Sequence, residues 1–335
     1  MTEVSNGFVQ RVEHDNDDLT AVNAARVSFA KTSTELDERD IKLLKYLANH
    51  DHWTPFSHIR IGMKLDYGMV LTAQLFNELG PLGLAGAQWH INGAGGLNLR
   101  MSLYGWLKML HCPVLHMQER IAILNELMVY APASVEVFTG MLLPEHSDSV
   151  LVTPLDSELD FDPRFHDVTF NLKMPIAIAR QWFKHQVGLT RNEVSRRYVS
   201  DKPEFFKIDE WRGAPTNGAK QGSSGVIDRE RLFMGDFEDV PEAWSESDVY
   251  QFSDNLYHWL LLVGVCPEQA RLALPQAMLT EFWETGSLAD YARIVKLRLD
   301  PHAQKEVRDY AQAVDEILTN SPDLASIWQI AKEKA

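Results

Sequence analysis

The residues best suited to chemistry lie in one window, residues 180–197, with the sequence RQWFKHQVGLTRNEVSRR. Its charged side chains are five cations and one acid: Arg180, Lys184, Arg191, Arg196, Arg197 and Glu193. An arginine fork matches phosphate oxygens in bidentate fashion, and Asn192, Ser195 and Tyr198 add neutral hydrogen-bonding groups. The window therefore indicates a pocket for a small phosphate-bearing ligand. The alternative is a solvated helix face whose arginines serve solubility.

Two further arginines could join such a pocket. Arg271 precedes the segment ALPQAML, and Arg298 ends a helical pattern, where the helix dipole alone would also favour a cation. Metal and thiolate chemistry are not indicated. His50, His52 and His58 lack the spacing of a metal motif, and the two cysteines, Cys112 and Cys266, stand far apart without a CxxC pair.

The charge and the apolar pattern of the whole chain argue against nucleic-acid and membrane partners. A formal net charge of −15 over 335 residues argues against a protein that coats DNA or RNA, because phosphate neutralisation needs a basic surface. The N-terminal residues have no apolar core behind a basic start, and no apolar run approaches the ~18 residues of a membrane span. We therefore expect a protein of the cytoplasm, without nucleic-acid or membrane partners.

Local patterns predict the elements that position these residues. A helix is expected from about 37 to 50, where Ile41, Leu44 and Leu47 recur behind an aspartate. Strict alternation predicts strands at 59–65 and 168–174. Between them, residues 66–166 form an insertion or subdomain, with helical patterns around 70–79 and 101–110 and an acidic link near 144–165.

Further helices follow the second strand. Pro175 begins a helix, PIAIARQWFKHQ, which leads into the polar run TRNEVSRRY. Residues 212–230 are rich in Gly, Ser, Asn and Pro and predict a flexible loop, of a kind that sometimes acts as a lid. A long helix is expected over 247–263, packing Tyr250, Phe252, Leu256, Trp259 and Leu260. Ser287 is expected to cap a helix that runs through Arg298, and Asp300-Pro301 to start the last long helix.

The 180–197 window resembles the signature of the flavin-dependent thymidylate synthases, RHR followed after seven residues by Ser, commonly read as RHRxxSxNExSxRY. Here the stretch reads KHQ at 184–186, then VGLTR, then NEVSRRY at 192–198. Three other blocks match in the family's order: AARVSF at 24–29, HWTPFSH at 52–58, and the run from Arg271 to Gln304. Together the four blocks cover about a third of the chain.

The resemblance implies a fold and a reaction. The fold would be α/β (α+β), a twisted, mainly antiparallel sheet flanked by helices, with 1–335 as one catalytic domain that holds 66–166 as an insertion. The reaction would be reductive methylation of dUMP to dTMP, with methylene-tetrahydrofolate as carbon donor, FAD as redox cofactor and NADPH as reductant. The protein would be a homo-oligomer, a tetramer, with sites shared between protomers.

The resemblance also implies roles for particular residues. Arg298, as the catalytic residue, would face the pyrimidine edge and favour ionisation at N3. The residues implied for dUMP are Gln181, Lys184, Glu193, Ser195, Arg196, Arg197, Arg271 and Arg298. Those implied for FAD are His52, Thr54, His185, Gln186, Glu193, Ser287 and Arg293.

Departures from the signature leave alternatives open. RHR is replaced by KHQ, the spacer to Ser195 has eight residues rather than seven, and Ser287, Ala289 and Arg293 stand where many members have asparagine and arginine. Another flavin-dependent pyrimidine C5 modification, or a non-catalytic nucleotide- or flavin-binding homologue, would fit the same pocket. An acidic helical interaction module without flavin is the third alternative.

Overall fold

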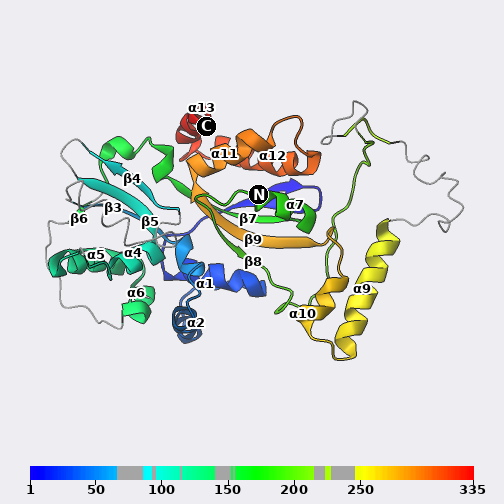
Figure 1. The fold of residues 1–335 in the computed structure, drawn as a ribbon, viewed down its shortest axis with the longest axis horizontal. Helices are drawn as coiled ribbons and strands as arrows, with labels where there is room; N and C mark the ends of the chain where they lie inside the picture. The colour runs from blue at the N-terminus through cyan, green and yellow to red at the C-terminus, as the bar shows by residue number, and fades with distance from the viewer. Residues whose placement is uncertain are drawn as a thin grey trace, which may run out of the picture.

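Two antiparallel sheets with helices packed on their faces make up the molecule (Figure 1). The computed structural model describes residues 1–65, 86–92, 96–113, 115–139, 152–153, 155–214, 223–227 and 246–335. The helical pattern at 70–79, residues 144–151 and 154 of the acidic link at 144–165, and much of the 212–230 loop lie outside the described residues. The expected α/β class with antiparallel strands is confirmed, although the strands form two sheets and not one.

The first sheet carries the motif-rich half of the chain. Its order is β1 (Thr2–Val4), β2 (Gly7–Val12), β7 (Asp167–Pro175), β9 (Leu279–Ser287) and β8 (Thr190–Glu193). Strand β7 is the strand expected at 168–174, and its alternate residues Phe170, Leu172 and Met174 are fully buried. Burying a Phe or Leu side chain contributes about 1.5–3 kcal/mol, so this core holds the sheet firmly against its helices.

Four helices share that core: α7 (Ile176–Trp182), α11 (Leu288–Arg298), α12 (Lys305–Thr319) and α13 (Ala325–Lys334). As expected, Ser287 caps α11 in a capping box with Asp290. Helix α7 ends at Trp182, earlier than the pattern suggested, and β8, which the sequence did not predict, follows a short turn. Hydrogen bonds from Arg298 and Arg191 to residues 181–185 bring the C-terminal ends of α7 and α11 and the start of β8 together.

The second sheet has the order β4 (Gln88–Ile91), β5 (Leu97–Ser102), β3 (Arg60–Leu65) and β6 (Val152–Thr153). Around it lie α1 (Asp18–Arg26), α2 (Glu38–Asn49), α4 (Leu103–Met109), α5 (Met117–Tyr130) and α6 (Pro132–Thr139). Helix α2, with its Asp37 cap, strand β3 and helix α4 match the expected elements, whereas β5 was not predicted. Residues from both sides of position 66 share one hydrophobic core.

Two expectations about the C-terminal half were wrong. Helix α12 begins at Lys305, because the Asp300 carboxylate accepts the backbone N–H of His302 at 2.8 Å and forms a turn there, and α13 follows it. Helix α9 (Glu246–Leu262) forms as expected, but Phe252 and Trp259 are 65% and 57% exposed. The helix turns Ser253 and Tyr257 inward instead.

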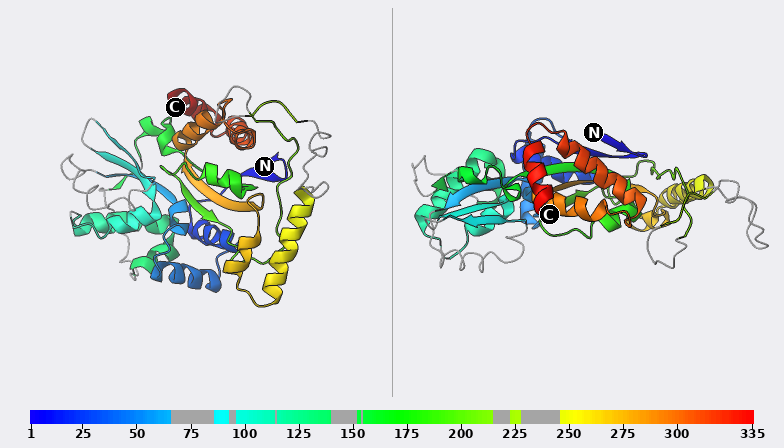
Figure 2. Two further views of the ribbon diagram at one scale, coloured as in Figure 1. Left: turned by 45° about the vertical axis from the view of Figure 1, so that its right-hand side comes forward. Right: turned by 90° about the horizontal axis from the view of Figure 1, so that it is seen from above.

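Helix α9 and the short α10 (Pro267–Ala270) lie at the end of the molecule opposite the second sheet (Figure 2). No helix in the described ranges has both the length and the apolar character that crossing a membrane requires.

Candidate functional site

The C-terminal ends of α7 and α11 bring three of the expected site residues together. Arg298 donates from Nε to Nε2 of His185 at 2.9 Å and from a terminal nitrogen to the backbone carbonyl of Gln181 at 2.8 Å. Burial and then the Arg298 guanidinium lower the pKa of His185 to about 4, so the imidazole is neutral at ordinary pH. A fixed guanidinium therefore lies beside a neutral histidine.

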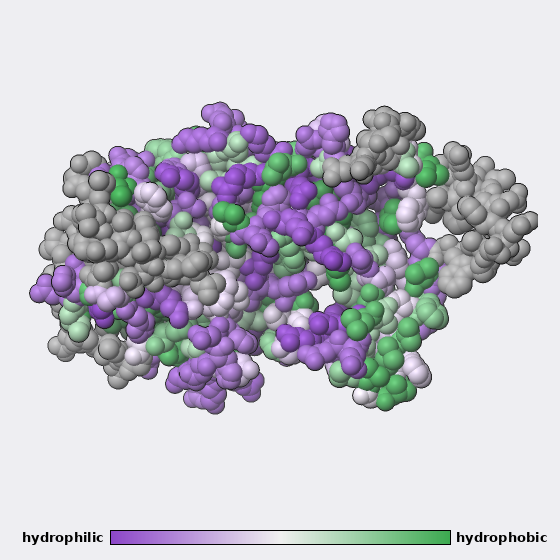
Figure 3. Space-filling view, in the orientation of Figure 1, coloured by the Kyte–Doolittle hydropathy of each residue, from purple (hydrophilic) through white to green (hydrophobic). Residues whose placement is uncertain are grey.

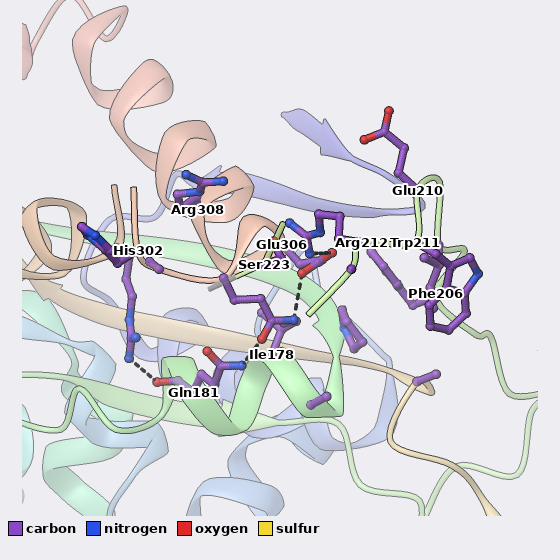
Figure 4. Close-up of a pocket in the computed structure, with 18 of the residues that line it drawn as sticks. Ile178, Gln181, Phe206, Glu210, Trp211, Arg212, Ser223, His302, Glu306 and Arg308 are labelled. Atoms are coloured by element: carbon purple, nitrogen blue, oxygen red, sulfur yellow. Dashed lines mark hydrogen bonds and ion pairs between the residues drawn. The ribbon is translucent and has the colours of Figure 1, made fainter. Parts of the chain in front are cut away.

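A cavity of about 1010 Å³ opens beside this pair, lined by residues of α7, the 206–214 segment and the start of α12. A row of hydrogen bonds runs along one wall (Figure 4). The Gln181 amide donates to Gln304 at 2.6 Å, Gln304 donates to Glu306 at 2.8 Å, and Arg212 pairs with Glu306. This row links the α7 residue to the base of the 212–230 loop.

A second cavity, of about 640 Å³, brings two cations of the 180–197 window together with Arg271. Its lining includes Glu193, Ser195, Arg196, Arg197 and Arg271. The Glu193 carboxylate accepts from the Thr280 hydroxyl at 2.6 Å. Ser195 is held through its backbone N–H, which donates to the Ser28 carbonyl at 3.1 Å and ties the AARVSF block to this wall.

The cations of the second cavity have weak internal partners. Arg197 lies 3.6 Å from a carboxylate oxygen of Glu268, Arg271 donates to the Glu268 carbonyl at 3.3 Å, and Arg196 donates to the Asp201 carbonyl. Arg197 and Arg271 are exposed, so these contacts are in solvent and worth little. Their guanidinium groups remain suited to binding an anion.

The residues expected to bind dUMP are thus divided between two cavities of one chain. Gln181 and Arg298 line the first, and Glu193, Ser195, Arg196, Arg197 and Arg271 line the second. The cavities flank the place where β7 passes into α7, at which the Ile176 N–H donates to the Met278 carbonyl. Lys184 lies on the exposed turn after α7.

The residues expected to bind FAD lie on several elements. Gln186 is exposed beside His185, and Arg293 of α11 pairs with Asp290. His52 and Thr54 follow α2, with the His52 ring edge-on to Tyr46 at 6.0 Å. The Ser287 side chain is buried and is used in capping α11, where its hydroxyl donates to Asp290 at 2.7 Å.

Sequence reasoning missed a group of buried polar residues behind the site. Glu284 is fully buried in β9, where it accepts the indole N–H of Trp182 at 3.0 Å and pairs with Arg191. A signal was present: Glu284 stands two positions after the buried Phe282, so alternation along the strand turns its side chain to the same buried face.

On the opposite face of β9, a hydrogen-bonded chain of side chains crosses to β8. It runs through His14, Thr169, Thr285, His58 and Asn192, with separations of 2.6–3.2 Å. Burial lowers the pKa of His58 to about 3, so this histidine is neutral within the chain. The described residues contain no group of three or more His, Cys, Asp or Glu side chains that could hold a metal ion.

Comparisons with known proteins agree with the motifs. A family model described as Thy1, thymidylate synthase complementing protein, matches residues 164–321. The flavin-dependent thymidylate synthase of Aquifex aeolicus (strain VF5) is 29% identical over 331 residues, which cover 90% of this chain and 94% of that protein. The enzyme of the same name from Thermosipho africanus (strain TCF52B) is 34% identical over 183 residues, covering 53% and 75%.

A crystal structure of the UMP/dUMP methylase PolB from Streptomyces cacaoi, bound with 5-Br UMP, is 17% identical with a TM-score of 0.45, covering 98% of this chain and 95% of that one. Two relatives from the genus Thermosipho are 34% and 32% identical to this chain, and the matched residues cover 75% and 77% of those proteins. This chain therefore belongs to the flavin-dependent thymidylate synthase family.

Proposed function

We propose that this chain methylates dUMP reductively to dTMP, with methylene-tetrahydrofolate as carbon donor, FAD as redox cofactor and NADPH as reductant. Family membership supports the reaction, and the relatives' name supports a flavin. The observation that carries the proposal is the placement of Arg298, whose guanidinium is held by His185 and the Gln181 carbonyl at the wall of a large cavity.

Arg298 is suited to the pyrimidine because it stays charged at any working pH. A fixed cation beside N3 stabilises the ring as an anion, which raises the electron density available at C5. The neutral His185 can keep this guanidinium oriented without competing for its charge. Arg298 is therefore the residue to which we assign the catalytic role.

The phosphate of dUMP would be held by neutral and cationic groups together. We assign it to Lys184, Ser195, Arg196, Arg197 and Arg271, with Gln181 and Glu193 contacting the nucleoside. Arginine forks bind phosphate oxygens in pairs, and the exposed, weakly paired Arg197 and Arg271 can turn toward such a ligand.

The residues near His185 also fit FAD. Burial and then the guanidinium groups of Arg298, Arg191 and Arg293 lower the pKa of His185, so the imidazole is neutral and can accept or donate a hydrogen bond to the cofactor. The residues that would hold FAD are His52, Thr54, His185, Gln186, Glu193 and Arg293, whereas Ser287 acts through its cap on the helix that carries Arg293. When bound, the flavin supplies hydride and one-carbon transfer, so no protein nucleophile is required.

We further propose a homotetramer whose sites are completed between subunits. The division of the dUMP residues between two cavities of one chain supports this assembly. So does the exposed apolar surface around α9 and α10, where Figure 3 shows a green area. The large exposed apolar side chains of this part of the chain are Phe252, Trp259, Leu262, Val263 and Leu272. Leu272 also lines the second cavity beside Arg271.

Residues 1–335 are proposed to form one catalytic domain with 66–166 inserted. Contacts across that boundary support a single unit: the buried Asp18 accepts the backbone N–H groups of Ala133 and Ser134, and Arg100 pairs with Asp167. Cys112 and Cys266 are unpaired, which suits a reducing compartment, and we propose the cytoplasm.

The experiment that tests the proposal is a product analysis. The purified protein, loaded with FAD, is incubated with dUMP, methylene-tetrahydrofolate and NADPH, and the nucleotide product is identified by mass spectrometry. Formation of dTMP is expected. A different C5 product would support another pyrimidine modification. Nucleotide binding without NADPH oxidation would identify a non-catalytic homologue, and a colourless protein an interaction module.

A further inference from the structure

A buried ion pair lies directly behind the turn that carries His185. Arg191 of β8 and Glu284 of β9 are partners in the strand register, and their side chains form an ion pair. The Glu284 side chain is 0% exposed and that of Arg191 is 16% exposed. Removing either partner would leave the other as an uncompensated buried charge, so the two residues act as one unit.

Both members of the pair also contact the turn after α7. A second nitrogen of Arg191 donates to the backbone carbonyl of His185, and its guanidinium lies 5.1 Å from the ring centre of Phe183. The other carboxylate oxygen of Glu284 accepts the indole N–H of Trp182 at 3.0 Å. The pair thus touches Trp182, Phe183 and His185.

These contacts change the role expected for Arg191. The sequence places it among the cations of a phosphate pocket, but its fork is used on Glu284 and on the His185 carbonyl. Only a guanidinium can make both contacts, because its donors have a fixed fork geometry. A lysine ammonium would keep the charge beside Glu284 and lose the carbonyl.

We propose that the Arg191–Glu284 pair is a positioning unit of the substrate site: it fixes the His185 carbonyl and thereby the imidazole that meets Arg298. This inference rests on the proposed function, in which Arg298 faces the pyrimidine. Neither residue lines the cavities that hold the dUMP residues. Misplacing His185 should therefore lower kcat and leave the KM for dUMP almost unchanged.

The test compares Arg191→Lys and Glu284→Gln with the control Asp40→Asn. Asp40 is a carboxylate with 1% exposure that pairs with Arg26, away from the α7 turn, so it matches the burial and the charge of Glu284. Each variant is assayed as flavin-loaded protein for kcat per bound flavin, KM for dUMP and melting temperature. We expect Arg191→Lys and Glu284→Gln to lower kcat roughly 10-fold or more, with KM within about 3-fold. Asp40→Asn should lower the melting temperature and leave kcat and the KM for dUMP unchanged.

An unchanged kcat per bound flavin in Arg191→Lys and Glu284→Gln would overturn the proposal. An equal loss of kcat in Asp40→Asn would also overturn the proposal, because the loss of kcat would then result from lower protein stability and not from a misplaced His185. A second readout is the imidazole ¹⁵N spectrum: the His185 Nε2 resonance should shift in Arg191→Lys and stay in place in Asp40→Asn. If the wild-type protein made no dTMP, the proposed function would fail, while this spectrum would still test the positioning.

Discussion

The Nε–H of Arg298 donates a 2.9 Å hydrogen bond to Nε2 of His185, which joins the last residue of α11 to the turn after α7. Because arginine has no acceptor, this nitrogen of His185 must be unprotonated. The histidine therefore orients the guanidinium while adding no charge of its own.

Replacing Arg298 with alanine is expected to leave a folded, flavin-containing protein that forms little dTMP. Losing a charged group that stabilises developing negative charge costs about 10²–10³-fold in kcat. The measurement is kcat per bound flavin, with circular dichroism as the control for folding. Arg298→Lys should recover part of the rate, because it keeps the charge without the fork. Turnover near that of the wild type in Arg298→Ala would remove this residue from its assigned role.

Arg271→Ala should weaken the binding of dUMP. It should leave the affinity for deoxyuridine unchanged, because deoxyuridine has no phosphate. A hydrogen bond to a charged group contributes about 1.5–3 kcal/mol, so the dissociation constant for dUMP should rise roughly 10- to 100-fold. Titration calorimetry with both ligands measures this. The control is Arg164→Ala, which removes an exposed arginine whose partner is Asp162, outside both cavities. Equal losses for dUMP and deoxyuridine would contradict a phosphate contact.

Stability should fall as the pH is lowered below about 6.5, and His58 should account for part of the change. Its pKa is lowered from 6.5 to about 3 in the folded protein, so the unfolded chain binds more protons between these values. Between pH 7 and pH 5 this one group should cost about 2 kcal/mol of unfolding free energy. Urea titrations of the wild type and of His58→Asn measure the difference.

The control for the pH experiment is the same pair of titrations above pH 7, where His58 is neutral in both the folded and the unfolded protein and the two slopes should be equal. His14, whose pKa is also lowered by burial, contributes in the same direction and should leave a residual slope in His58→Asn. An identical slope in the wild type and in His58→Asn would mean that His58 is not a buried neutral group.

Elements with local signals were predictable from the sequence. The Asp37 cap and the recurring Ile41, Leu44 and Leu47 predict α2, and alternation predicts β7, because these patterns depend only on neighbouring residues. The order of the first sheet was not predictable in this way. Strand β8 is four residues long and polar, and it forms because β9 offers it an edge.

The site shows the same limit. The count of charges in the sequence groups Arg191 with Arg196 and Arg197. In the structure, the ion pair with Glu284 directs the Arg191 side chain inward. These two residues are 93 positions apart, and no spacing rule predicts such a contact. Likewise, helical periodicity places Phe252 and Trp259 in a core, although one chain leaves them exposed. An apolar helical face looks the same in sequence whether it faces a core or another subunit.

The last prediction separates two FAD residues that the sequence treats alike. The Ser287 hydroxyl is buried in the α11 capping box, so Ser287→Ala should lower the free energy of unfolding by about 1 kcal/mol and change FAD affinity by less than about 3-fold. The Arg293 side chain is 50% exposed and its pairing with Asp290 can be exchanged for a phosphate contact, so Arg293→Ala should weaken FAD binding about 10-fold. Flavin fluorescence measures affinity and urea titration measures stability. If Ser287→Ala weakened FAD binding as much as Arg293→Ala at unchanged stability, the hydroxyl would be a cofactor contact and not a cap.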